Sequence, residues 1–84
     1  MALQNISAIV DNKGDYIDIF LNSRGNLIVK ILNVHGLFIK TVIGSIQDTA
    51  EKISVKLDDL SSGSYVLNIF KDNSFIRSFH YSKT

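Results

Sequence analysis

Three residue types are missing from this chain: its 84 residues include no cysteine, no proline and no tryptophan. Without cysteine the chain can form no disulfide, no thiolate metal site and no cysteine nucleophile. Without proline every backbone N–H remains available to a β-ladder. Without tryptophan, any aromatic surface for stacking sugar rings has to be built from phenylalanine and tyrosine. Packing and backbone hydrogen bonds must therefore hold the fold together.

A strong net charge and long apolar runs are also lacking. Nine basic residues against eight acidic ones leave a formal net charge of +1, which gives no electrostatic basis for binding nucleic acid or an anionic membrane. No apolar stretch approaches the roughly 20 residues of a membrane span, so membrane insertion is not expected. The opening residues lack the basic-then-apolar form of a secretory signal. The chain is therefore expected either to stay inside the cell or to be cut from a longer exported protein.

The chain is nevertheless 45% hydrophobic, which is enough to form a core, and its length predicts a single domain over residues 1–84. Short apolar runs alternate with turn residues along it. We expect strands at residues 3–10, 16–21, 27–34, 37–43, 52–57, 65–70 and 75–81. Runs spaced in this way are typical of an all-β sandwich or barrel.

Alternation of side chains supports the strand interpretation. In one run Ile53, Val55 and Leu57 point to one face, and in another Tyr65 and Leu67 do the same. In the last run Phe75, Arg77, Phe79 and Tyr81 are expected to share a face opposite Ile76, Ser78 and His80. A polar loop is expected at residues 44–50, and the least helix-averse stretch, residues 47–52, is too short to form a helix alone. The sequence predicts two antiparallel sheets packed over one core.

Two hairpins and one crossing connection are predicted from turn residues. His35-Gly36 and Asp72-Asn73 are the tight turns of the hairpins. At residues 57–65 a strand ends, Leu60 returns to the core, Gly63 permits a tight turn, and Tyr65 opens the next strand. In immunoglobulin-like sandwiches a tyrosine at this place folds its hydroxyl back onto the crossing backbone. We therefore expect an immunoglobulin-like sandwich of about seven strands.

The residues that could carry chemistry do not assemble into a site. The only two histidines, His35 and His80, fall in a turn and on the last strand, which does not suit a metal site. Asp58 and Asp59 are adjacent and are interpreted as turn caps rather than calcium ligands. The turn serines lack the setting of a nucleophile elbow: they are Ser61, Ser62 and Ser64. No enzyme, cofactor or metal site is predicted.

The aromatic residues leave a second functional class open. Phe38, Phe70 and Tyr81 are candidates for an exposed strip that could stack sugars, as in carbohydrate-binding or adhesive accessory modules. Arg77, placed on an otherwise apolar face, is interpreted either as a side chain that extends past the sheet edge or as a charge that contacts a partner. A purely structural spacer is a third alternative.

Two stretches together resemble a known family. Residues 27–41 contain a strand, an asparagine-x-x-glycine turn and a second strand with lysine, marked by Asn33, Gly36 and Lys40. Residues 53–69 contain a strand followed by a leucine, glycine and tyrosine pattern, marked by Leu60, Gly63 and Tyr65. From about residue 16 onward the chain resembles the C-terminal sorting domains of Bacteroidetes type IX (Por) secretion cargo.

The resemblance implies a role as a C-terminal module of a longer secreted protein. Such a cargo passes through the periplasm, its module is recognised by an outer-membrane secretion translocon and is often removed by a sortase-like peptidase, and the cargo is then linked to lipopolysaccharide at the cell surface. The domain would be an address and would carry no catalysis. As a hypothesis, recognition uses exposed strand edges and four residues near the end of the sequence: Arg77, His80, Tyr81 and Lys83.

Overall fold

The computed structural model describes residues 8–48 and 51–84, and its regular elements are all strands. Within these ranges no helix could cross a membrane. The strands are β1 (Ala8–Asn12), β2 (Tyr16–Leu21), β3 (Gly25–Asn33), β4 (Phe38–Ile46), β5 (Lys52–Lys56), β6 (Gly63–Lys71) and β7 (Ser74–Lys83). The predicted all-β class is confirmed.

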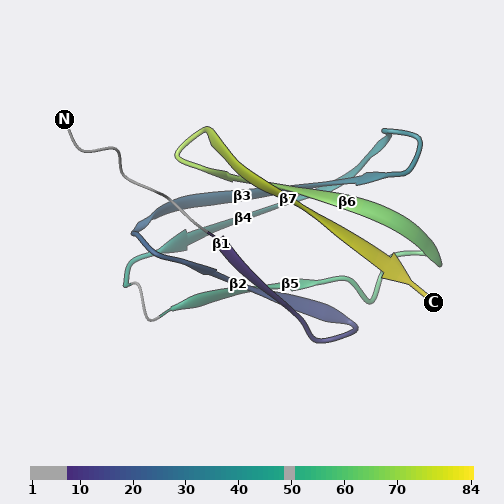
Figure 1. Cartoon of the computed structure of the whole chain (residues 1–84), viewed down its shortest axis with the longest axis horizontal. Helices are drawn as coiled ribbons and strands as arrows, with labels where there is room; N and C mark the ends of the chain where they lie inside the picture. The colour runs from purple at the N-terminus through teal and green to yellow at the C-terminus, as the bar shows by residue number, and fades with distance from the viewer. Residues whose placement is uncertain (1–7, 49–50) are drawn as a thin grey trace.

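The strands form two antiparallel sheets that lie one above the other (Figure 1). One sheet has the order β1-β2-β5 and the other has the order β4-β3-β6-β7. The chain therefore crosses between the layers after β2, after β4 and after β5. Crossings of this kind, with the sixth strand between the third and the seventh, characterise immunoglobulin-like sandwiches.

The core lies between the two layers and follows the predicted alternation. The side chains that are at most 1% exposed are almost all aliphatic and come from both sheets and their connections: Ile17, Ile19, Leu27, Val29, Ile31, Ile46, Val55, Leu57, Leu67 and Ile69. Ile53 packs against this cluster from β5. Burial of such side chains is the main force that holds two sheets together.

The predicted alternation of the last strand is wrong at its start. Ile69 pairs with Arg77, but the next residue, Phe70, pairs with Phe75, so Ile76 is an extra residue in β7. A β-bulge of this kind reverses the phase of the strand. Phe75 consequently lies on the outer side, 57% exposed, and meets Phe70 edge to face at 5.7 Å between ring centroids. Ile76 instead packs against the core.

Strand β4 is longer than predicted. Its last residues, Gly44 to Ile46, belong to the strand and not to the expected loop. The physical reason is packing: Ile46 is 1% exposed, and a Cβ on Gly44 would come within 2.7 Å of Ile53 Cδ1. Glycine thus allows the edges of the two sheets to approach. Residues 3–7 of the first predicted run and residues 49–50 of the loop lie outside the described residues.

Both predicted hairpin turns are present. Asp72 and Asn73 have φ angles of 49° and 68°, the positive values that a type I′ turn requires at both central positions. The Asp72 carboxylate also accepts a hydrogen bond from the Asn26 N–H at 3.0 Å. The turn is thereby tied to the start of β3, the strand that pairs with β6.

The left-handed backbone of Asn73 leads to a testable prediction. Asn73→Gly should hold or raise the free energy of unfolding, because glycine adopts a positive φ without a steric penalty. Asn73→Val should lower it by about 1–2 kcal/mol, because a β-branched residue is strained there. Urea unfolding of the two variants measures the difference, and equal midpoints would contradict this account of the turn.

Candidate functional site

The β3–β4 turn is shaped by Asn33 and Gly36. The Asn33 side-chain oxygen accepts hydrogen bonds from the N–H groups of His35 and Leu37, at 2.9 and 3.0 Å. The Asn33 backbone carbonyl accepts one from the Gly36 N–H at 3.0 Å. Gly36 has a φ of 77°, which glycine adopts most readily. The asparagine and the glycine of the asparagine-x-x-glycine motif thus stabilise one tight turn.

The crossing segment, residues 56–61, carries the chain from β5 to β6. Leu60 returns to the core at 8% exposure, and β6 begins at Gly63, whose φ is 146°. The hydroxyl of Tyr65 donates a 2.6 Å hydrogen bond to the Ser61 carbonyl. This is the tyrosine corner expected from the sequence. It fastens the crossing to the strand that follows it.

Two lysines hold the same segment from other strands. Lys40 on β4 donates to the Lys56 carbonyl and to the Asp59 carboxylate, both at 2.8 Å. The Lys40 hydrogen bond also lowers the pKa of Asp59. Lys83 on β7 donates to the Leu57 carbonyl at 2.8 Å. Together with the Tyr65 hydroxyl, three side chains from three strands of the large sheet therefore bond to the crossing segment.

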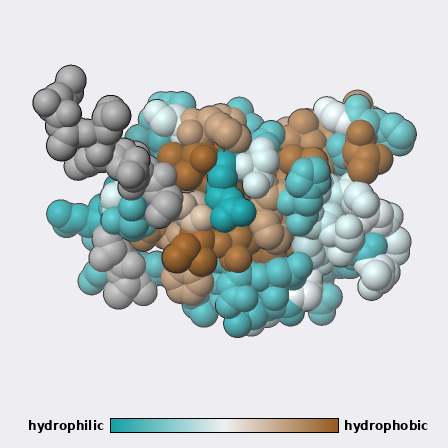
Figure 2. Space-filling model, viewed as in Figure 1, coloured by the Kyte–Doolittle hydropathy of each residue, from teal (hydrophilic) through white to brown (hydrophobic). Residues whose placement is uncertain are grey.

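Three of the four predicted contact residues on β7 point inward. Besides Lys83, Arg77 donates to the Ala8 carbonyl at 3.0 Å, and the Tyr81 hydroxyl donates to the Gly14 carbonyl at 2.6 Å. Burial, with a smaller effect of the Asp15 charge, raises the pKa of Tyr81, so its hydroxyl remains a donor. These bonds join β7 to the other sheet on the side where hydrophobic surface shows between the layers (Figure 2).

The outward side of β7 is different. His80 is exposed and pairs with Val66 on β6. The expected exposed strip is not formed, because Tyr81 is 4% exposed and points into the sandwich. Phe38 and Phe70 remain on the outer side but lie in different cross-strand rows, opposite Leu32 and Ile28 respectively.

The motif residues gather at one end of the large sheet. Asn33 pairs with Tyr65 and Tyr65 pairs with Tyr81, so the three form one row across β3, β6 and β7. Gly63 pairs with Lys83 beside this row. Two predicted contact residues lie apart from this group. Arg77 is directed toward β1, and His80 lies on the outer side of β7. The two parts of the family pattern, distant in sequence, are therefore adjacent in space.

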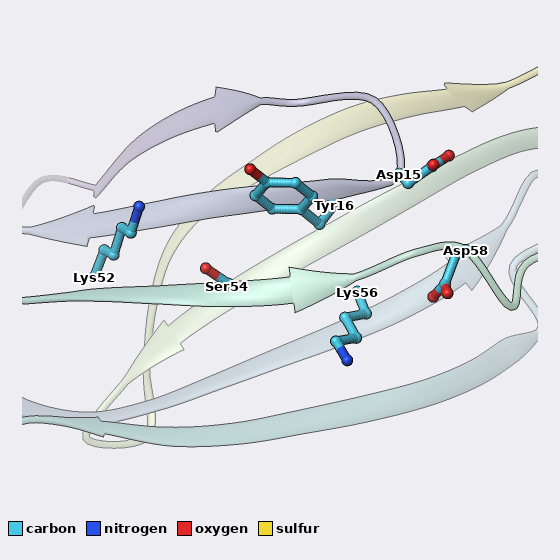
Figure 3. A pocket seen from close by; sticks show the side chains of 6 residues that line it. All are labelled: Asp15, Tyr16, Lys52, Ser54, Lys56 and Asp58. Atoms are coloured by element: carbon cyan, nitrogen blue, oxygen red, sulfur yellow. The ribbon is translucent and has the colours of Figure 1, made fainter.

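A shallow hollow lies on the outer side of the small sheet (Figure 3). It is lined by Asp15, Tyr16, Lys52, Ser54, Lys56 and Asp58. The side chains do not converge on one point (Figure 3). In the part of the chain that the structure describes, no three His, Cys, Asp or Glu side chains are grouped so as to hold a metal ion. The hollow has the mixed charges of an ordinary solvated sheet face.

Sequence reasoning did not single out Asp18, the one buried charged residue among those described. It is 1% exposed and accepts hydrogen bonds from the Ser54 hydroxyl at 2.6 Å and the Lys52 ammonium at 3.1 Å. The Ser54 hydrogen bond is the larger cause that lowers the pKa of Asp18, and Lys52 adds to it. The sequence did contain a signal for it, an aspartate inside an apolar run. The hydrogen-bond partners of Asp18 could not be predicted, because they depend on its pairing with Ser54 across β2 and β5.

The tyrosine corner can be tested by removing one atom. Tyr65→Phe keeps the buried ring and leaves the Ser61 carbonyl without its donor, so it should cost about 1–2 kcal/mol of unfolding free energy. For a domain of this size that corresponds to a melting temperature lower by about 4–16 °C. Tyr16→Phe, at a tyrosine that is 40% exposed, is the matched control and should change little. Equal melting temperatures would show that the corner does not stabilise the fold.

The Asp18 cluster predicts a pH dependence. Because folding lowers the pKa of Asp18, its contribution is present above the unfolded carboxyl value of about 3.9 and is lost as the pH falls through the folded value. Wild type should therefore be more stable than Asp18→Asn at neutral pH, and the difference should shrink below about pH 4. Chemical unfolding at several pH values measures it. A difference that stays constant down to pH 2 would contradict the assignment.

The comparison with known proteins agrees with the resemblance seen in the sequence. Residues 12–79 match the family model described as "Secretion system C-terminal sorting domain", a span that includes Asn33, Gly36, Lys40 and Tyr65. No curated protein matches the chain. Domains of this family serve type IX secretion, which implies export through the periplasm to the cell surface or the exterior. The chain belongs to the type IX secretion C-terminal sorting domain family.

Proposed function

We propose that residues 1–84 form a single non-catalytic address module at the C-terminus of a longer secreted protein, and that the module directs this protein to the cell surface. The observation that carries the proposal is the family match over residues 12–79. The partners in this proposal are an outer-membrane translocon and a sortase-like peptidase that later removes the module.

The use of the motif residues supports recognition of a folded shape. Asn33 and Gly36 shape a turn, while Lys40 and Tyr65 bond to the crossing segment. A sequence signature maintained by such contacts preserves a surface geometry rather than a set of reactive groups. The polar side chains of Asp18, Ser54 and Lys52 are likewise used in internal hydrogen bonds, which supports a non-catalytic role.

The four residues proposed as partner contacts divide into two kinds. Arg77, Tyr81 and Lys83 are positioning residues, because their side chains bond to backbone carbonyls of the same domain. His80 is exposed on the outer side of β7, and Arg77 also keeps an exposed surface, so these two of the four can touch a partner directly. The module is therefore proposed to present β7 in a fixed place, with its outer side available.

A reporter fusion tests the sorting function. A reporter with a signal peptide is joined to the full 84-residue chain and expressed in a bacterium that has type IX secretion. The reporter should reach the cell surface or the medium, and it should remain in the periplasm in a strain without the translocon. Retention in the periplasm of the competent strain, or equal export of a reporter without the domain, would contradict the proposal.

A short deletion tests the contribution of β7. Removing residues 81–84 takes away Tyr81 and Lys83, and with them two of the bonds that hold β7 to the rest of the fold. Export of the fusion should be abolished. His80→Ala leaves these bonds in place and should reduce export without lowering the melting temperature. Unchanged export after the deletion would rule out a role of residues 81–84 in sorting.

A further inference from the structure

The outer side of the four-stranded sheet, termed here the outer face, carries an unusual hydrophobic row. Pairing across the sheet places Ile43 beside Ile28, Ile28 beside Phe70 and Phe70 beside Phe75. The row therefore crosses all four strands. Its two ends are the most accessible, with Ile43 74% and Phe75 57% exposed. An exposed apolar surface that continues across a whole sheet marks an interaction site more often than a solvated face.

A second hydrophobic row lies parallel to the first. Phe38 pairs with Leu32 and Leu32 pairs with Val66, and Phe38 is 58% exposed. The two rows are four residues apart along β3, from Ile28 to Leu32. At about 3.3 Å per residue this is a separation of about 13 Å. The outer face thus offers two parallel apolar bands.

A polar row lies between the bands and carries one positive charge. Thr41, Lys30, Asn68 and Ser78 pair in this order across the sheet. The Lys30 ammonium lies 5.0 Å from the centre of the Phe70 ring, a cation–π contact that holds the charge over the face. The strand residues that point to this side include no aspartate and no glutamate. The charge of Lys30 is therefore uncompensated on the outer face.

The outer side of the small sheet lacks this pattern. Asp11 and Asp18 lie there with Lys52 and Lys56, so both signs are present. Ile9, which is 65% exposed, pairs there with Phe20, and Tyr16 is 40% exposed, but Asp18 separates Tyr16 from Phe20 along β2. The two outer sides therefore differ in arrangement: on the small sheet charges of both signs interrupt the apolar residues, whereas on the outer face the apolar rows are continuous and the charge has one sign.

We propose that the outer face binds a protein surface of the type IX machinery that presents two apolar ridges with a carboxylate between them. The carboxylate would pair with Lys30 while the ridges cover the two apolar rows. Charges arranged in this complementary way fix the register of two surfaces, and the apolar rows supply the buried area. This inference rests on the proposed sorting function and names the chemistry of its partner.

Two other occupants fit less well. The same face of a second copy would offer Lys30 no carboxylate, and a two-fold axis through the polar row would place the two lysines against each other, which is unfavourable. A membrane would remove water from the charged Lys30 ammonium and from the polar pair Asn68 and Ser78, whose mutual hydrogen bond does not satisfy all of their polar groups, at a large desolvation cost. Both occupants are included as outcomes of the experiment.

The experiment uses matched substitutions on the two outer sides of the full chain in the reporter fusion. On the outer face they are Lys30→Glu and the double variant Ile43→Ser/Phe75→Ser. On the small sheet the controls are Lys56→Glu, which makes the same charge change, and Ile9→Ser. Melting temperatures of the isolated domains confirm that each variant folds. The wild-type fusion must be exported before the variants are compared. If it is not exported, the proposed sorting function is refuted, and the experiment does not address the outer face.

The outer-face variants should lose about tenfold or more of the surface-displayed reporter, whereas Lys30→Arg and both controls should match wild type. Equal export of all variants would overturn the proposal. Loss with the apolar variant but not with Lys30→Glu would overturn the carboxylate partner. Sedimentation that shows a dimer abolished by Ile43→Ser/Phe75→Ser would instead assign the face to a second copy. Binding to phosphatidylglycerol vesicles that Lys30→Glu abolishes would assign it to a lipid surface.

Discussion

Hydrogen bonds to the crossing segment, residues 56–61, connect most of the features described above. Lys40, Tyr65 and Lys83 reach this segment from β4, β6 and β7. Each donates to a backbone carbonyl where the chain leaves one sheet for the other, a place at which the strand ladders no longer supply donors. Leu60 is buried by the same turn of the backbone. The relative placement of the two sheets at this end follows from these contacts.

The same contacts explain what the family pattern means physically. Asn33 and Tyr65, which belong to separate parts of the pattern, are paired neighbours on β3 and β6. Residues far apart in the sequence thus lie together because they build one end of one sheet. The functional surface then need not coincide with the pattern: the outer face, with Lys30 between its apolar rows, is built by other residues of the same strands.

Much of this architecture could be predicted from local patterns. Period-two alternation located the strands, and the residues of the Asp72-Asn73 turn and of the tyrosine corner were sufficient to predict those connections. The β-bulge at Ile76, the burial of Asp18 and the length of β4 could not be predicted, because each depends on which residue lies opposite in another strand. Tyr81 was a candidate for an exposed aromatic strip, and its burial likewise depends on a distant part of the chain. Its hydroxyl bonds to Gly14, 67 positions earlier in the chain.

That long separation also affects when the domain can form. The Arg77 and Tyr81 bonds link β7 to Ala8 and Gly14, across 69 and 67 positions, and Lys83 closes the crossing segment. Until residue 83 has left the ribosome, β6 has an unpaired edge and the inner face of its sheet is incompletely covered. Contacts of such long range also form slowly. The domain therefore completes its fold only after synthesis of its last strand.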